Sequence, residues 1–202
     1  PRRSSVFIQI IQGKCTRQQE LHEHLDTWRN ELGSGAPGWL GGTYGFTDDD
    51  MFMGIVRFES RDAAMANSGR PEQDAWAARM MELFDGPVEF HDCDDVTLLM
   101  DGGSDDAGFV QVIRGKVDDP DRLRSMMTAD TDSLHQMRPE IIGGTLAIEP
   151  DGTFTETVAF TSEDAARQGE QLEPPAEVRE DLEYAMADAQ FYDLHRPWFA
   201  SR

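Results

Sequence analysis

The chain has 202 residues, which is enough for one large domain or two small ones. Its 39 acidic residues outnumber its 18 basic ones, and the formal net charge of −21 argues against nucleic-acid binding, because neutralising phosphates requires clustered Lys and Arg. The same charge disfavours an anionic membrane surface as a partner.

The first predicted element recurs in the second half of the chain. FIQIIQGK at residues 7–14 returns as FVQVIRGK at residues 109–116, an offset of 102. Further blocks align in the same register without a gap: LGGT at 40–43 with IGGT at 142–145, and FESRDAA at 58–64 with FTSEDAA at 160–166. This agreement indicates a tandem duplication.

The repeat suggests how the chain is divided. We expect a first repeat at residues 1–100, a linker at residues 101–108 and a second repeat at residues 109–202. The linker is rich in Gly and Asp, two residue types that favour turns and flexible connections.

Each repeat begins with a predicted strand and a predicted helix. Residues 6–12 are apolar on both faces, as expected for a strand in a sheet that is covered on both sides. After the GKCT turn, one apolar stripe at helical spacing is formed by Leu21, Leu25, Trp28 and Leu32.

Two more strands, a second helical region and a fourth strand follow. The strands are predicted at WLGGTYGF (39–46) and MFMGIVRFE (51–59), and Ser60 occupies the N-cap position of the next helix. NSGRP interrupts that helical region, and a last strand begins near PVEFH. The order βαββαβ, present twice, describes a ferredoxin-like unit.

We therefore predict the α+β class, with two tandem ferredoxin-like units. A four-stranded antiparallel sheet with helices on one face leaves its other face apolar and uncovered, so we expect the two sheets to pack face to face as a barrel within one chain. Duplication then supplies the partner that a separate subunit would otherwise provide. The chain would be a pseudo-dimer, and further homodimerisation is left open.

The chain resembles the dimeric α+β barrel proteins, and among them the antibiotic-biosynthesis-monooxygenase-like (ABM-like) proteins. The residues that carry the resemblance are the QGK and RGK turns, the PGWLGGTYGF strand, the VRFESRDAAMAN segment and the FDGPVEFHDC segment. It covers nearly the whole chain and implies a pocket between the helices and the sheet of each unit. Its motifs specify a fold better than a reaction.

The resemblance to the quinone-forming monooxygenases of this family implies a site that needs no metal or flavin. Such a site requires an aromatic-lined slot with a few polar groups around a phenol and the anion formed from it. The candidates for the chemistry are Asn67, Arg57 and His91, and the candidates for substrate binding are Gln9, Trp28, Tyr44 and Trp76. Arg57 would be the counter-charge and His91 the base.

The two repeats differ at the positions where this chemistry is expected. At the offset of 102, the residues Trp28, Trp39, Tyr44, Arg57, Asn67, Trp76 and His91 align with Asp130, Ile141, Leu146, Ala159, Gly169, Val178 and Asp193. The second set has no equivalent aromatic, amide, guanidinium or imidazole group. We therefore expect the pocket in the first repeat.

Structural roles compete with these assignments. Arg57 can extend from a sheet edge to solvent, Trp28 and Trp76 stand at core spacing on helices, and His91 can be a surface residue. Three functions follow for the protein: a cofactor-independent monooxygenase or a related isomerase or cyclase acting on an aromatic or polyketide-like molecule, a non-catalytic small-molecule-binding protein, or a stress-associated protein with a filled pocket.

We expect no cofactor and no metal. The haem-degrading branch of the family has a pocket Asn where this chain has Gln9 and Gln111, but its haem-ligating His falls near Trp76, and neither repeat offers a His there. His91, Cys93 and Asp95 on one extended strand lie too far apart to share an ion. Two cysteines, with no signal peptide or membrane span, favour a cytoplasmic protein with reduced thiols.

Overall fold

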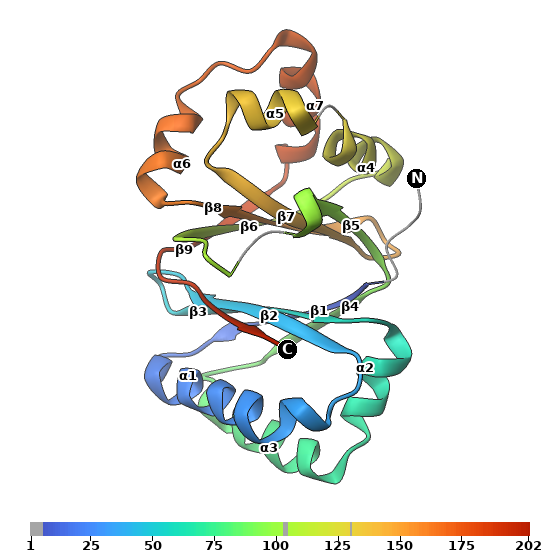
Figure 1. Cartoon of the computed structure of the whole chain (residues 1–202), viewed down its shortest axis with the longest axis vertical. Helices are drawn as coiled ribbons and strands as arrows, with labels where there is room; N and C mark the ends of the chain where they lie inside the picture. The colour runs from blue at the N-terminus through green and yellow to red at the C-terminus, as the bar shows by residue number, and fades with distance from the viewer. Residues whose placement is uncertain (1–5, 103–104, 130) are drawn as a thin grey trace. The chain divides into compact units, whose positions relative to one another are not determined.

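The computed structural model describes residues 6–102, 105–129 and 131–202. They form two compact units, which are described one at a time. The N-terminal unit consists of residues 6–94 and 198–202, and the C-terminal unit consists of the described residues from 95 to 197. In each unit, helices cover one face of a five-stranded antiparallel sheet (Figure 1). The predicted α+β class is confirmed.

The N-terminal unit has the predicted βαββαβ order with one additional strand. Its elements are β1 (Phe7–Lys14), α1 (Gln18–Thr27), a π-helical turn η1 (Trp28–Leu32), a 3₁₀ turn η2 (Gly33–Gly35), β2 (Trp39–Phe46), β3 (Met51–Phe58), α2 (Arg61–Ser68), α3 (Pro71–Leu83), β4 (Glu89–Cys93) and β10 (Trp198–Ser201). The strand order in the sheet is β10-β2-β3-β1-β4.

The C-terminal unit repeats this arrangement. Its elements are β5 (Asp95–Leu99), η3 (Met100–Gly102), β6 (Phe109–Lys116), α4 (Pro120–Thr128), α5 (Thr131–Met137), β7 (Ile141–Ile148), β8 (Thr153–Phe160), α6 (Glu163–Glu170), α7 (Ala176–Met186) and β9 (Gln190–Leu194). The order β5-β7-β8-β6-β9 matches that of the first sheet strand for strand.

The fifth strand of each sheet was not predicted, and it changes the division of the chain. β5 follows β4 in sequence but pairs with β7, and β10 follows β9 but pairs with β2. The units therefore divide after residues 94 and 197, whereas the sequence suggested a first repeat ending at residue 100. Residues 103 and 104 of the expected linker lie outside the described residues.

Strand alternation sorts the side chains of each sheet onto two faces. In β1, Phe7 and Ile11 belong to the core beneath the helices, while Ile8 and Ile10 lie on the opposite face. All four are at most 5% exposed. Burial on both faces agrees with the doubly apolar pattern of residues 6–12.

The repeat loses one residue before its last strand. Gln9 pairs with Asp92 in β4, and Gln111 pairs with Asp193 in β9, so the offset there is 101. The segment between α7 and β9 spans residues 187–189, whereas its counterpart between α3 and β4 spans residues 84–88. The equivalent of His91 is thus Tyr192, and the alignment of His91 with Asp193 was wrong.

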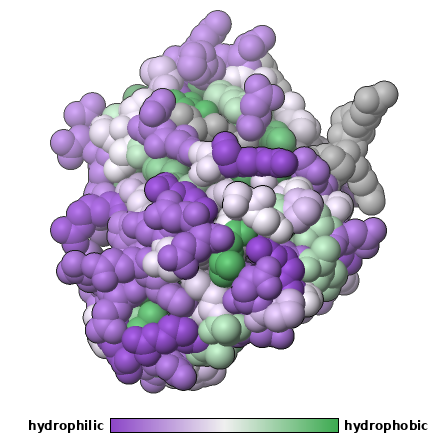
Figure 2. All heavy atoms as spheres, turned by 60° about the horizontal axis from the view of Figure 1, so that its bottom comes forward, coloured by the Kyte–Doolittle hydropathy of each residue, from purple (hydrophilic) through white to green (hydrophobic). Residues whose placement is uncertain are grey.

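The surface agrees with the acidic, polar composition. Figure 2, where the helices of the N-terminal unit come forward, shows mostly hydrophilic residues with apolar residues in small separate groups. No helix among the described residues combines the length and apolar character that a membrane crossing requires.

Candidate functional site

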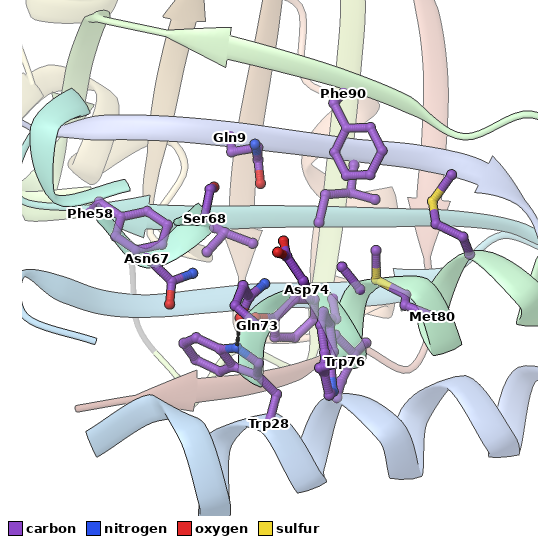
Figure 3. Close-up of a pocket in the computed structure, with 16 residues that line it drawn as sticks. Gln9, Trp28, Phe58, Asn67, Ser68, Gln73, Asp74, Trp76, Met80 and Phe90 are labelled. Atoms are coloured by element: carbon purple, nitrogen blue, oxygen red, sulfur yellow. Dashed lines mark hydrogen bonds between the residues drawn. The ribbon is translucent and has the colours of Figure 1, made fainter. Parts of the chain in front are cut away.

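A pocket lies between the sheet and the helices of the N-terminal unit. Its volume is about 390 Å³, and its lining residues come from β1 to β4, α1 to α3 and η1 (Figure 3). A ferredoxin-like unit with helices on one face can hold a ligand there because only side chains fill the space between the two layers. We call it the N-terminal pocket.

The walls of the N-terminal pocket are aromatic and sulfur-containing. The aromatic and methionine residues of the lining are Trp28, Tyr44, Phe58, Trp76, Met80, Met81 and Phe90. Trp76 is fixed by its neighbour in α1: its Nε1 donates to the carbonyl of His24 over 2.9 Å, and the two rings stack with centroids 4.6 Å apart. Flat aromatic walls of this kind suit a planar ring system.

Asn67 supplies an oriented amide at the end of α2. Ser60 caps this helix by accepting a hydrogen bond from the amide of Ala63 over 3.0 Å. Arg70 donates from Nη1 to Asn67 Oδ1 over 3.0 Å and to the carbonyl of Leu32 over 3.1 Å. With its oxygen engaged, Asn67 turns its NH₂ group toward the pocket interior (Figure 3).

Gln73 supplies a second oriented amide. Trp28 Nε1 donates to Gln73 Oε1 over 2.6 Å (Figure 3), so the donors of the Gln73 NH₂ group remain available to a ligand. Trp28 opens the π-helical turn η1, an irregularity that is frequent at functional sites. Asn67 and Gln73 therefore offer N–H donors from two different helices.

Two acceptors complete the polar set. Asp74 lies in the first turn of α3, where a helix N-terminus stabilises negative charge, and it is the one carboxylate among the described residues that line the pocket. Gln9 donates from Nε2 to Asp92 Oδ1 over 2.9 Å, which leaves its carbonyl oxygen as an acceptor.

The Tyr44 side chain forms part of the pocket wall, and its phenol is uncharged at physiological pH. It is 5% exposed, and burial raises the pKa of its phenol to about 12. Tyr44 stacks on Phe52 with ring centroids 6.3 Å apart, and both rings belong to the N-terminal core. Its contribution to a ligand is contact area and, through the protonated hydroxyl, hydrogen bonding.

The structure brings together five of the seven residues proposed from the sequence. Gln9, Trp28, Tyr44, Asn67 and Trp76 all line the N-terminal pocket.

Arg57 and His91 do not belong to this group. In β3 and β4 the pocket-lining residues are Val56, Phe58 and Phe90, so alternation puts Arg57 and His91 on the opposite face of the sheet. Arg57 Nη1 donates there to Thr43 Oγ1 over 3.1 Å. Because neither residue lines the N-terminal pocket, its geometry does not support their proposed roles as counter-charge and base.

The sequence interpretation missed Ser68, Gln73 and Asp74. All three flank the point where α2 ends and α3 begins, which the sequence shows only as an interruption of a helical pattern. Polar residues on both sides of such a break could have been predicted as pocket residues, because the ends of both helices can face the interior at a break. Ser68 donates to the carbonyl of Ala64 over 3.2 Å.

A metal-based site finds no support in the arrangement of the side chains. Within residues 6–102, 105–129 and 131–202, no three His, Cys, Asp or Glu side chains come close enough to hold an ion together. Cys15 and Cys93 are both buried free thiols, and burial raises the pKa of the Cys15 thiol.

Comparisons with known proteins identify the fold. No family model and no curated protein matches the sequence. A solved structure of a protein provisionally named a monooxygenase, from Fusobacterium nucleatum subsp. nucleatum, aligns over 98% of this chain and 94% of its own, with a TM-score of 0.78 and 9% identity.

Two further solved structures agree. A provisionally named monooxygenase from Lactobacillus acidophilus covers 97% of this chain and 96% of its own, with a TM-score of 0.71 and 12% identity. An anthrone oxidase-like protein covers 98% of this chain and 91% of its own, with a TM-score of 0.70 and 11% identity. At such low identity these likenesses show that the chain shares the α+β fold of these proteins over nearly its whole length, and nothing about its reaction.

Proposed function

We propose that the protein is a cofactor-independent monooxygenase that oxidises an electron-rich aromatic molecule in the N-terminal pocket. The observation that carries the proposal is the pair of amide donors, Asn67 and Gln73, held by Arg70 and Trp28 inside an aromatic-walled pocket. Its volume of about 390 Å³ lies within the range of roughly 300–1,000 Å³ that is usual for small-molecule pockets.

Anthrones illustrate the substrate class, because one structural neighbour is an anthrone oxidase-like protein. Asp74 would accept a proton from the substrate, and the N–H groups of Asn67 and Gln73 would stabilise the anionic oxygen that results. Trp28, Trp76 and Phe90 would hold the rings.

The reaction consumes one molecule of oxygen. The substrate anion reduces O₂ and forms a carbon–oxygen bond, which gives a peroxide at the former methylene carbon. Loss of the second methylene proton and cleavage of the O–O bond then leave a carbonyl group and one water. Anthrone plus O₂ thus gives anthraquinone plus water, so the substrate supplies all the reducing electrons.

Oxygen uptake by the purified chain with a panel of anthrones and naphthols tests the proposal. Asn67→Ala removes one oriented donor, and we expect uptake to fall by about 10²-fold, the usual effect of losing one such donor. Gln9→Ala should also lower the rate. Gln111→Ala is its matched control, because Gln111 makes the same bond to Asp193 in the C-terminal unit.

Binding without turnover is the second candidate. It is favoured by the position of Asp74, whose exposed side chain is the only carboxylate that the described lining residues contribute. Saturable binding of a naphthol, abolished by Asn67→Ala and accompanied by no oxygen uptake, would establish a carrier or sensor. Absence of both uptake and saturable binding would contradict both functions.

A further inference from the structure

The entrance of the N-terminal pocket lies between α3 and the edge strand β4. Phe90 of β4 and Met81 of α3 both line the pocket, and they are 45% and 43% exposed. Trp28, Tyr44 and Asn67 also line it but are buried, so they form its closed end. A ligand therefore reaches the interior by passing between Phe90 and Met81.

Asp74 stands at this entrance. It precedes Met81 by seven residues, which is about two helical turns, so both side chains project from the same face of α3. Like Met81, it lines the pocket and is exposed. Figure 3 shows its carboxylate pointing from α3 toward the sheet. A ligand that enters the pocket therefore passes this charge.

The described residues that line the pocket include no Lys, Arg or His to balance the Asp74 charge. Arg70 holds the Oδ1 atom of Asn67, and its own Nε donates to Glu72 over 3.1 Å. Arg57 lies on the opposite face of the sheet. The net charge of −21 adds to the negative potential of the entrance.

The polar groups of the pocket suit a hydroxyl or carbonyl group better than a carboxylate. The Asn67 and Gln73 amides offer N–H donors, whereas the Gln9 carbonyl oxygen and Asp74 offer acceptors. Figure 3 shows Gln9 pointing from β1 toward the helices and Asp74 pointing from α3 toward the sheet. A hydroxyl group can donate to these acceptors, but an ionised carboxylate only accepts.

We propose that Asp74 makes the N-terminal pocket selective for uncharged hydroxylated aromatic molecules over their carboxylated analogues. A ligand carboxylate at the entrance lies beside the Asp74 carboxylate, and like charges repel. A ligand carboxylate at the closed end loses its water without gaining a cation. The proposal rests on ligand binding in the pocket of the proposed function, but it does not depend on oxygen consumption there.

Calorimetric titration of the full chain at pH 7 with 6-hydroxy-2-naphthoate and its methyl ester tests this selectivity. Both probes carry the same rings and hydroxyl group, but the ester is uncharged and larger. Steric exclusion would therefore favour the acid, whereas repulsion by Asp74 favours the ester. We expect the ester to bind about tenfold more tightly, which corresponds to about 1.4 kcal/mol.

Three variants assign the preference to Asp74. Asp74→Asn should bring the two affinities to within about threefold of each other, and Asp74→Lys should make the acid the tighter ligand. Because Asp74 is exposed, both variants are expected to fold. Asp62→Asn is the matched control, because it removes the same charge from an exposed position of α2 that does not line the pocket, and it should keep the tenfold preference.

Equal affinity of the wild type for the acid and the ester would overturn the proposal, and so would saturable binding of neither probe. A loss of preference in Asp62→Asn as large as that in Asp74→Asn would overturn it too, because the net charge would then be the cause. Binding of the ester without oxygen uptake would contradict the monooxygenase reaction but would leave the measured selectivity in support of this inference.

Discussion

Glu156 links the stability of the C-terminal unit to pH. Its folded-state pKa of about 7 lies above the ordinary value of 4.5, so between these two values the folded chain binds a proton that the unfolded chain has released. The free energy of unfolding contributed by this group therefore falls as pH rises from 4.5 to about 7, and it is constant above that window.

Glu156→Gln removes this titration, and urea denaturation of both chains at pH 5 and pH 8 measures the effect. We expect the variant to gain stability relative to wild type by on the order of 1–3 kcal/mol between the two pH values, with the lower end favoured by the partial exposure of the residue. A stability difference that does not change with pH would show that Glu156 titrates normally.

Individual residues of the pocket could be predicted where strand and helix periodicity decide their direction. Gln9, Trp28 and Trp76 all line the N-terminal pocket. The helical spacing of Trp28 and Trp76 indicated an inward face, whereas Gln9 was chosen from the family resemblance. Arg57 and His91 were misplaced although the register could have excluded them: Gln9 pairs with Val56, so Arg57 must point to the other face. The positions of Gln73 and Asp74 in the pocket depend on the angle between α2 and α3. The sequence composition at the break does not define that angle.

The helix N-caps were predictable from single residues. Ser60 accepts from Ala63 over 3.0 Å, and Ser162 accepts from Ala165 over 3.1 Å, at equivalent positions of α2 and α6. We expect Ser60→Ala and Ser162→Ala each to reduce the free energy of unfolding by about 1 kcal/mol, the usual cost of a lost cap. Denaturant titration of the two variants measures it.

The two cap variants should differ in ligand binding. α2 carries Asn67 into the N-terminal pocket, so Ser60→Ala is expected to weaken naphthol binding by a few-fold, whereas Ser162→Ala serves as the matched control with unchanged affinity. Equal losses of affinity in both variants would indicate a general effect of stability rather than of positioning.

The edge strands could not be predicted because their pairing is non-local. β10 has only four residues, WFAS, and β5 has five, DVTLL, too few for a periodic pattern to stand out. Each pairs with a strand more than 40 residues away in sequence. Local propensity thus defines the four-stranded core of each sheet and leaves its fifth strand undefined.

At the scale of the whole molecule, the C-terminal residues complete the N-terminal unit. Trp198 of β10 stacks on His22 with ring centroids 3.9 Å apart and lies 5.7 Å from Tyr44. We expect Trp198→Ala to destabilise this unit by about 2 kcal/mol, less than for a fully buried Trp because the residue is half-buried. Amide hydrogen exchange should accelerate in β2 and remain unchanged in β7. Equal acceleration in both strands would contradict the assignment of β10 to the N-terminal unit.

The two units share one topology but carry different side chains between the helices and the sheet. The N-terminal unit keeps aromatic walls and oriented amides, and the C-terminal unit replaces Tyr44 and Asn67 with Leu146 and Gly169. Because the two sheets share one strand order, the difference lies in side chains rather than in topology. A specific aromatic ligand is therefore expected at one of the two helix-to-sheet spaces.

A crystal structure of the chain soaked with 1-naphthol tests this account most directly. We expect one naphthol per chain between α3 and its sheet, with its oxygen within hydrogen-bond distance of the Asn67 and Gln73 amide nitrogens and its rings against Trp76. A naphthol bound instead on the sheet face that carries Arg57 and His91, or a pocket closed by its own side chains, would contradict it.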